Sequence, residues 1–169
     1  AAREADAVCF GTLAQRSAIN RETIATLLAA TRPDALRILD VNFRPPFVDF
    51  ASLPNSLARA NVLKLNDDEL PQLATSLGIA GTQPEILAAL ASRFELHAVA
   101  LTRGSKGSLL HARGEFSDHP GVPAIVADTV GAGDAFTAAM TLGLLREWPL
   151  DRINQLANEV AAFVCSQPG

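Results

Sequence analysis

The stretch DTVGAGDAF, residues 128–136, decides how this chain is interpreted, and it stands directly before the clearest helical pattern in the sequence. Two glycines and an alanine occupy positions 131–133, where we expect a helix to begin and run to about residue 146. Backbone N–H groups and the dipole at the start of a helix attract anions. Asp134 falls in that first turn, where its carboxylate would repel a phosphate unless it had a chemical task, such as accepting a proton from an attacking hydroxyl. The alternative is a glycine-rich turn with Asp134 as the helix N-cap.

Strand-like and helix-like patterns alternate over the rest of the chain. We expect strands at 7–13, 37–42, 61–65 and 97–101, and a hairpin formed by 107–112 and 115–119. We expect helices at 21–30 with Asn20 as cap, after Asn66 with a late start or bend at Pro71, at 84–93, at 132–146 and at 152–165. This order predicts an α/β fold with a mostly parallel sheet, and the lack of repeats and linkers predicts one domain over 1–169.

Polar residues stand at the carboxyl ends of three expected strands. They form the pairs Asp40/Asn42, Lys64/Asn66 and Thr102/Arg103. Ligands of open α/β sheets bind outside the carboxyl ends of the strands, so the three pairs outline a candidate cleft.

Composition narrows the class of protein. The chain has 169 residues, 49% hydrophobic and 19% charged, with a net charge of −4, which argues against a nucleic-acid partner. No apolar run approaches the roughly 20 residues that span a bilayer, and the first residues resemble no signal peptide, so we expect a cytoplasmic protein without a membrane partner. Cys9 and Cys165 are expected to be buried free thiols. The chain lacks an initiator Met and begins partway through a strand pattern, so we expect a fragment.

The quoted motif and three shorter ones resemble the ribokinase/PfkB family of carbohydrate kinases. Residues 128–134 match the family's Asp-Thr-x-Gly-Ala-Gly-Asp signature at every fixed position. Residues 40–44 (DVNFR) resemble an element of its fructokinase and 2-keto-3-deoxygluconate kinase branch, residues 66–69 its Asn-x-x-Glu motif, and residues 102–107 its Thr-x-Gly-x-x-Gly turn. The resemblance implies a ribokinase-like fold with helices on both faces of the sheet. It makes residues 1–169 the C-terminal catalytic and nucleotide-binding part of one domain, without the N-terminal strands and lid.

The resemblance also implies roles for single residues. Asp134 is expected to be the general base, and Gly131, Ala132 and Gly133 to stabilise the transferring phosphoryl group through their N–H groups. The residues expected to contact ATP are Asn66, Glu69, Thr102, Gly104, Gly107 and Asn158, and those expected to contact the sugar are Asp40, Asn42 and Arg44. Glu69 is expected to hold Mg²⁺ through water, and Asp128, with Thr129, to shape a site for a monovalent cation such as K⁺.

Several alternatives stay open at the level of sequence. Asn66 and Glu69 also fit a helix capping box, a role compatible with Mg²⁺ binding. Arg44, Arg103 and Lys106 also fit solvated surface charges. The chain fits an ATP-dependent sugar kinase, or a nucleotide- or sugar-binding regulatory homologue without catalysis. A homodimer formed through the lid is a further implication of the resemblance, and fructose-like and 2-keto-3-deoxygluconate-like substrates both remain.

Overall fold

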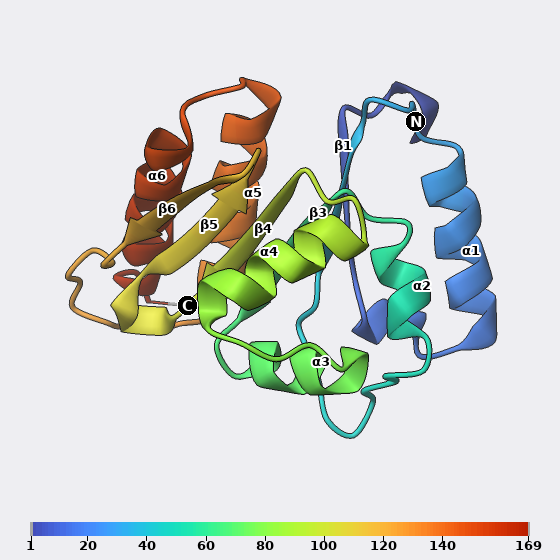
Figure 1. Ribbon diagram of the computed structural model, residues 1–169. Helices are drawn as coiled ribbons and strands as arrows, with labels where there is room; N and C mark the ends of the chain where they lie inside the picture. The colour runs from blue at the N-terminus through green and yellow to red at the C-terminus, as the bar shows by residue number, and fades with distance from the viewer. Residues whose placement is uncertain (1, 169) are drawn as a thin grey trace.

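Short strands and longer helices alternate along the first hundred residues, and a hairpin and two helices follow (Figure 1). The computed structural model describes residues 2–168. Its strands are β1 (Ala7–Gly11), β2 (Leu36–Asp40), β3 (Val62–Asn66), β4 (Ala98–Thr102), β5 (Ser108–Ala112) and β6 (Glu115–His119). Its α-helices are α1 (Ala18–Ala29), α2 (Leu53–Leu57), α3 (Glu69–Leu77), α4 (Gln83–Arg93), α5 (Ala132–Leu145) and α6 (Leu150–Cys165). Three single turns of 3-10 helix are η1 (Ala2–Glu4), η2 (Leu13–Gln15) and η3 (Gly104–Lys106).

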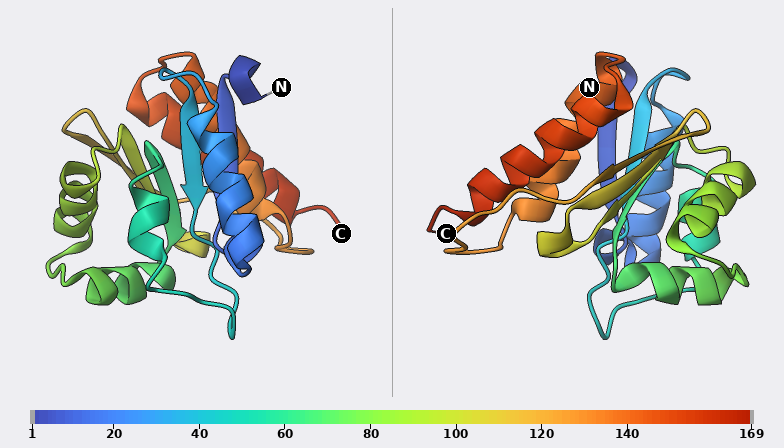
Figure 2. Two further views of the ribbon diagram at one scale, coloured as in Figure 1. Left: turned by 90° about the vertical axis from the view of Figure 1, so that its right-hand side faces the viewer. Right: turned by 60° about the vertical axis from the view of Figure 1, so that its left-hand side comes forward.

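The strands of residues 2–168 form one six-stranded sheet in the order β1-β2-β3-β4-β5-β6. The first four strands are parallel, and β5 and β6 add an antiparallel hairpin. Each parallel strand is added on the same side of the last one, and crossovers have a fixed hand, so the connecting helices α1 to α4 gather on one face. Helices α5 and α6 cover the other face (Figure 2). This arrangement confirms the predicted α/β fold with a mostly parallel sheet between helices.

Alternation along the strands builds a core on each face of the sheet. In β3, Leu63 and Leu65 join the larger cluster beneath α1 to α4, whereas Val62 joins the cluster beneath α5 and α6. Lys64 has the same parity as Val62, so this lysine points from the middle of a buried strand toward α5. Lys64 is therefore the charged exception in this apolar core, and it lies close to the start of α5.

Three local expectations need correction. Helix α1 begins at Ala18 and is capped by Ser17, whose hydroxyl accepts from the N–H of Asn20, so Asn20 is not the cap. Helix α2 was not predicted, because five residues are too few to display a helical period. Cys9 is exposed on β1 and Cys165 is partly buried, both as free thiols.

Within residues 2–168, no helix is long and apolar enough to cross a membrane.

Candidate active site

A cavity of about 680 Å³ opens between β1, β2 and one side of α5. Two residues expected to contact sugar, Asp40 and Asn42, line this cavity together with Asp134. Ile38, Leu142 and other apolar side chains form the rest of the wall. Asp40 ends β2, whereas Asp134 is 94 residues further along the chain, in the first turn of α5. The fold thus gathers the expected base and two expected sugar contacts around one hollow, as ligand sites of open α/β sheets require.

The glycine-rich stretch forms the beginning of α5. Gly131 is the N-cap residue, with φ of +82°, a left-handed conformation that glycine adopts without steric cost. Helix α5 begins at Ala132, so Asp134 is its third residue and lies in the first turn. The alternative in which Asp134 is the N-cap is therefore wrong. Asp134 is exposed to solvent at the N-terminus of α5.

Backbone donors without a partner stand at this helix start. In the chain from residue 2 to 168, no acceptor meets the N–H groups of Gly131 and Gly133, whereas that of Ala132 donates to the Thr129 carbonyl at 3.3 Å. Free N–H groups at the positive end of a helix dipole favour a bound anion. The geometry therefore supplies two of the three expected donors without rearrangement.

Beneath this turn lies a buried ion pair. The Lys64 ammonium is 3.1 Å from Asp40 Oδ1, and the Thr137 hydroxyl is 3.2 Å from Asp40 Oδ2. All three residues are at most 6% exposed. Burial raises the pKa of the Asp40 carboxyl above its ordinary value, and the neighbouring Lys64 opposes that rise. A Cβ added at Gly133 would lie 3.2 Å from Lys64 Nζ, so the ammonium also packs directly against the glycine-rich turn.

Asn66 and Glu69 form a reciprocal pair at the end of β3. The N–H of Asn66 donates to Glu69 Oε2 at 2.8 Å, and the N–H of Glu69 donates to Asn66 Oδ1 at 2.9 Å. These are the two hydrogen bonds of a capping box, but α3 begins at Glu69 with Asp68 as its N-cap residue, so the pair closes the turn before the helix and the expected capping box is wrong. Glu69 Oε1 also accepts from the N–H of Phe43 at 2.8 Å, which ties the segment after β2 to the end of β3. Burial raises the pKa of the Glu69 carboxyl, against these N–H donors.

These hydrogen bonds limit how Mg²⁺ can be bound here. Both carboxylate oxygens of Glu69 and the amide oxygen of Asn66 already accept main-chain N–H groups. Each oxygen of Glu69 retains a lone pair, whereas Asn66 Oδ1 also accepts from the N–H of Asp68 at 3.0 Å and is fully used. Glu69 therefore fits contact with water of a hydrated ion better than direct ligation. Within residues 2–168, no group of three or more His, Cys, Asp or Glu side chains is arranged to hold a metal.

The expected nucleotide residues lie beside this pair, at the carboxyl ends of β3 and β4. Asn66 and Thr102 are direct partners in the parallel ladder. Gly104 follows with φ of +57° and open space where a Cβ would stand. Gly107 is different, because a Cβ there would lie 2.0 Å from the His119 carbonyl oxygen. The absence of a side chain at Gly107 is thus already explained by packing against the strand end at His119.

The remaining expected site residues lie apart from the cavity. Arg44 is exposed in the segment after β2 and does not line the cavity. Asp128 Oδ1 accepts from the N–H of Val130 at 2.9 Å, which shapes the approach to α5. Asn158 in α6 is buried, and its amide donates to the Ser108 hydroxyl at 2.7 Å and to Asn154. Its amide group is therefore engaged inside the protein, on the side of β5.

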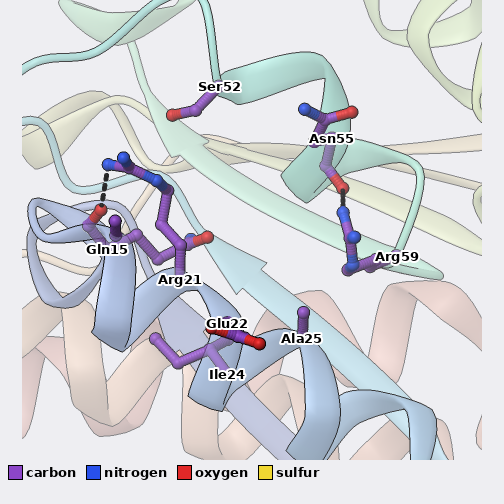
Figure 3. A pocket seen from close by; sticks show the side chains of 9 residues that line it. Gln15, Arg21, Glu22, Ile24, Ala25, Ser52, Asn55 and Arg59 are labelled. Atoms are coloured by element: carbon purple, nitrogen blue, oxygen red, sulfur yellow. Dashed lines mark hydrogen bonds between the residues drawn. The ribbon is translucent and has the colours of Figure 1, made fainter.

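A second concavity, of about 410 Å³, lies between α1 and α2. Arg21 and Arg59 line it, but their guanidinium groups donate to the carbonyls of Gln15 and Asn55 and point away from each other (Figure 3). None of the expected site residues lines this hollow. The candidate active site is therefore the cavity beside Asp134.

Sequence reasoning missed the contacts that Lys64 and Thr137 make with Asp40. A lysine within the apolar strand VLKLN was the available signal, because a buried ammonium needs an anionic partner. Thr137 gave no signal, since a threonine in a helix is ordinary.

Comparison with known proteins gives a family match over the whole chain. The model of the pfkB family carbohydrate kinases matches residues 1–169. A fructokinase of Klebsiella pneumoniae is 34% identical over 109 residues, which cover 64% of this chain and 34% of that protein. A sugar kinase of Pyrococcus horikoshii, solved in complex with ATP, superposes with a TM-score of 0.82 at 28% identity, covering 99% of this chain and 54% of the other.

A fructokinase of Xylella fastidiosa, solved with bound ATP, shares the fold with a TM-score of 0.85 at 20% identity, covering 99% of this chain and 57% of that one. These likenesses confirm the ribokinase-like fold expected from the motifs. The chain spans about half the length of these solved relatives and a third of the Klebsiella fructokinase.

Proposed function

The chain belongs to the pfkB family of carbohydrate kinases, and from that premise we propose that it carries the phosphoryl-transfer site of an ATP-dependent sugar kinase, with Asp134 as the general base. The observation that carries the proposal is the position of Asp134. Its exposed carboxylate stands between a cavity that Asp40 and Asn42 also line and a helix start with free N–H donors. A base must lie beside both the attacking hydroxyl and the group that is attacked.

The cavity on the β1–β2 side is the proposed sugar site. Asn42 offers an amide to hydroxyl groups, and each oxygen of Asp40 retains a lone pair beside its internal partners. We place Arg44 at the edge of this site, where its guanidinium would meet an anionic group of the substrate. The likeness to a fructokinase makes a ketohexose the first substrate to examine.

The nucleotide is proposed to lie on the other side of the α5 helix start. Thr102 and Gly104 stand at the carboxyl end of β4, next to Asn66. From there a triphosphate would reach the N–H groups of Gly131 and Gly133, which would stabilise charge on the transferred group. Gly107 is proposed to shape the turn, and Asn158 to support it through Ser108.

Mg²⁺ would neutralise charge on the phosphates. In this proposal Glu69 orients water around the ion through the lone pair that each of its oxygens retains, and Asn66 holds the Glu69 carboxylate in place. A monovalent cation near Asp128 and Thr129, cytoplasmic location and a homodimer stay predictions.

The test compares Asp134→Asn with wild type in the complete protein. We expect ATP binding to persist and kcat to fall by about 10²–10⁴, the usual contribution of a positioned base. Asp151→Asn is the matched control, since Asp151 stands in the first turn of α6, away from the cavity. Retention of more than half the wild-type kcat by Asp134→Asn would remove Asp134 from the role of base.

A coupled ADP-release assay over a panel of sugars defines the substrate. The panel includes fructose, ribose, a sugar phosphate and 2-keto-3-deoxygluconate. ATP binding without turnover on any of them would favour the regulatory homologue over the kinase.

A further inference from the structure

Lys64 is a buried charge in β3, on the same face as the apolar Val62. Its side chain is 8% exposed on the face of β3 that α5 covers. A buried ammonium is tolerated when an anionic partner compensates for lost hydration, and Asp40 Oδ1, at 3.1 Å on the adjacent strand, is that partner. The ion pair thus joins β3 to the end of β2.

The second oxygen of Asp40 carries the contact onward into α5. Asp40 Oδ2 is 3.2 Å from the Thr137 hydroxyl, which is 3.0 Å from the carbonyl oxygen of Gly133. A hydroxyl has a single proton, so Thr137 donates to one of these oxygens at a time. Gly133 immediately precedes Asp134. Thr137 therefore lies between the sheet and the backbone beside the proposed base, and its hydroxyl bonds one of the two at a time.

Lys64 also lies close to this turn on the side of the sheet. A Cβ at Gly133 would lie 3.2 Å from Lys64 Nζ, closer than ordinary van der Waals contact. The ammonium of Lys64 therefore lies next to Gly133, and a side chain at this position would crowd it. A shift of the helix start toward the sheet would meet Lys64, and a shift away would stretch the contacts of Thr137.

We propose that Lys64 and Thr137 are positioning residues, which act through Asp40 to fix the first turn of α5 against the sheet and thereby orient Asp134. The role of Asp134 rests on the proposed kinase function, whereas the order of the turn is a separate property of the protein. Misplacement of a reacting group by about 1 Å can cost 10²-fold in rate, so a loosened turn has a measurable effect.

The first test removes one hydroxyl. Thr137→Val keeps the shape of the side chain and breaks the link between Asp40 and Gly133. We expect kcat of the complete protein to fall by roughly 10- to 100-fold with less than a twofold change in the KM for sugar. We also expect faster amide hydrogen exchange in residues 131–137. The matched control is Thr23→Val in α1, where the hydroxyl likewise bonds the carbonyl four residues earlier, at 2.9 Å, but touches no ion pair.

The second test asks whether Lys64 acts through the same contacts. Lys64→Met is expected to lower kcat and loosen the same turn. The double variant with Thr137→Val should lose little more than the worse single variant, because residues of one network are not additive. Arg32→Met controls for loss of an exposed ion pair, since Arg32 pairs with Asp6 and Asp34 away from the cavity. If Lys64→Met does not fold, Thr137→Val decides alone.

The outcomes separate this inference from the proposed function. Unchanged kcat and hydrogen exchange in Thr137→Val would overturn the positioning role, as would a loss confined to KM, which would make Thr137 a sugar contact. Full additivity of the two changes would also overturn it. If the wild-type protein phosphorylates no sugar, the kinase proposal fails, and exchange of residues 131–137 still decides whether Lys64 and Thr137 fix the turn.

Discussion

Gly133 has two physical reasons to be glycine, and they predict different things. Its free N–H group favours an anion, and Lys64 Nζ leaves little room for a Cβ. Gly133→Val adds a branched side chain that would crowd both the N–H group and Lys64 Nζ. We expect kcat/KM for ATP to fall by at least about 10²-fold while the protein stays folded, because the valine side chain would block the N–H donors at the start of α5.

Kinetics and melting temperature measured on one preparation of Gly133→Val separate the two reasons. If activity declines only in proportion to the folded fraction, Gly133 is needed for packing against Lys64 and does not bind phosphate.

Cys9 offers a chemical probe of the proposed sugar cavity. Desolvation, with the carboxylates of Asp40 and Asp134 nearby, raises the pKa of its thiol, so less thiolate is present at pH 8 than for an ordinary cysteine. We expect maleimide to label Cys9 more slowly than free cysteine at pH 8, and faster as pH rises toward that pKa. Saturating substrate sugar should slow the reaction further, because Cys9 lines the cavity. Labelling followed by peptide mass spectrometry measures this, and a rate indifferent to sugar would move the sugar site elsewhere.

At the scale of elements, Glu69 joins three parts of the fold. It accepts from Phe43 after β2 and from Asn66 at the end of β3, and it begins α3. Glu69→Gln replaces one acceptor by a donor that faces an N–H group. We expect the free energy of unfolding to fall by about 1–3 kcal/mol, the cost of an unsatisfied buried group. Denaturant unfolding measures this.

Glu85→Gln is the matched control for that change. Glu85 forms the exposed capping box of α4 with Thr82 and joins no second strand, so the change there should cost less stability than in Glu69→Gln. Equal stability of Glu69→Gln and wild type, with a raised Mg²⁺ requirement, would assign Glu69 to the ion alone.

The elements that the sequence predicted well are those with a strong apolar signal. The strand expected at 97–101 is β4 at Ala98–Thr102, and the helix expected at 132–146 is α5. Both are apolar runs bounded by polar residues. The start of α1 was misassigned because Ser17 and Asn20 are both good caps, and local sequence does not choose between them.

The candidate site was predictable to the extent that its residues belong to a motif or end a strand. Asp40, Asn42 and Asp134 meet in one cavity as the parallel fold required. The contact of Thr137 with Asp40 spans 97 positions and depends on how α5 crosses the sheet. The burial of Asn158 against Ser108 likewise depends on the packing of α6 on β5, which short motifs do not encode.

At the scale of the molecule, the proposed sugar cavity lies at one end of the sheet. β1 is one of the two edge strands in residues 2–168, and Cys9 and Asp134 in the cavity wall are exposed to solvent. Phosphoryl transfer to a sugar needs water excluded from the reacting groups, since water competes as the acceptor. The related sugar kinase of Pyrococcus horikoshii has about twice as many residues as this chain covers. The exposed residues Cys9 and Asp134 indicate that the proposed sugar cavity is open on one side in residues 2–168.

We therefore expect residues 1–169, expressed by themselves, to bind ATP weakly and to phosphorylate no sugar. The N–H donors of the α5 helix start are present, so some affinity for a triphosphate should remain. Asp134→Asn should leave that affinity intact, whereas Gly133→Val should remove it. Calorimetric titration with ATP measures the binding, and the coupled assay measures turnover. A kcat of about 1 s⁻¹ or more for residues 1–169, within the usual range of enzymes, would show instead that this half builds a complete site.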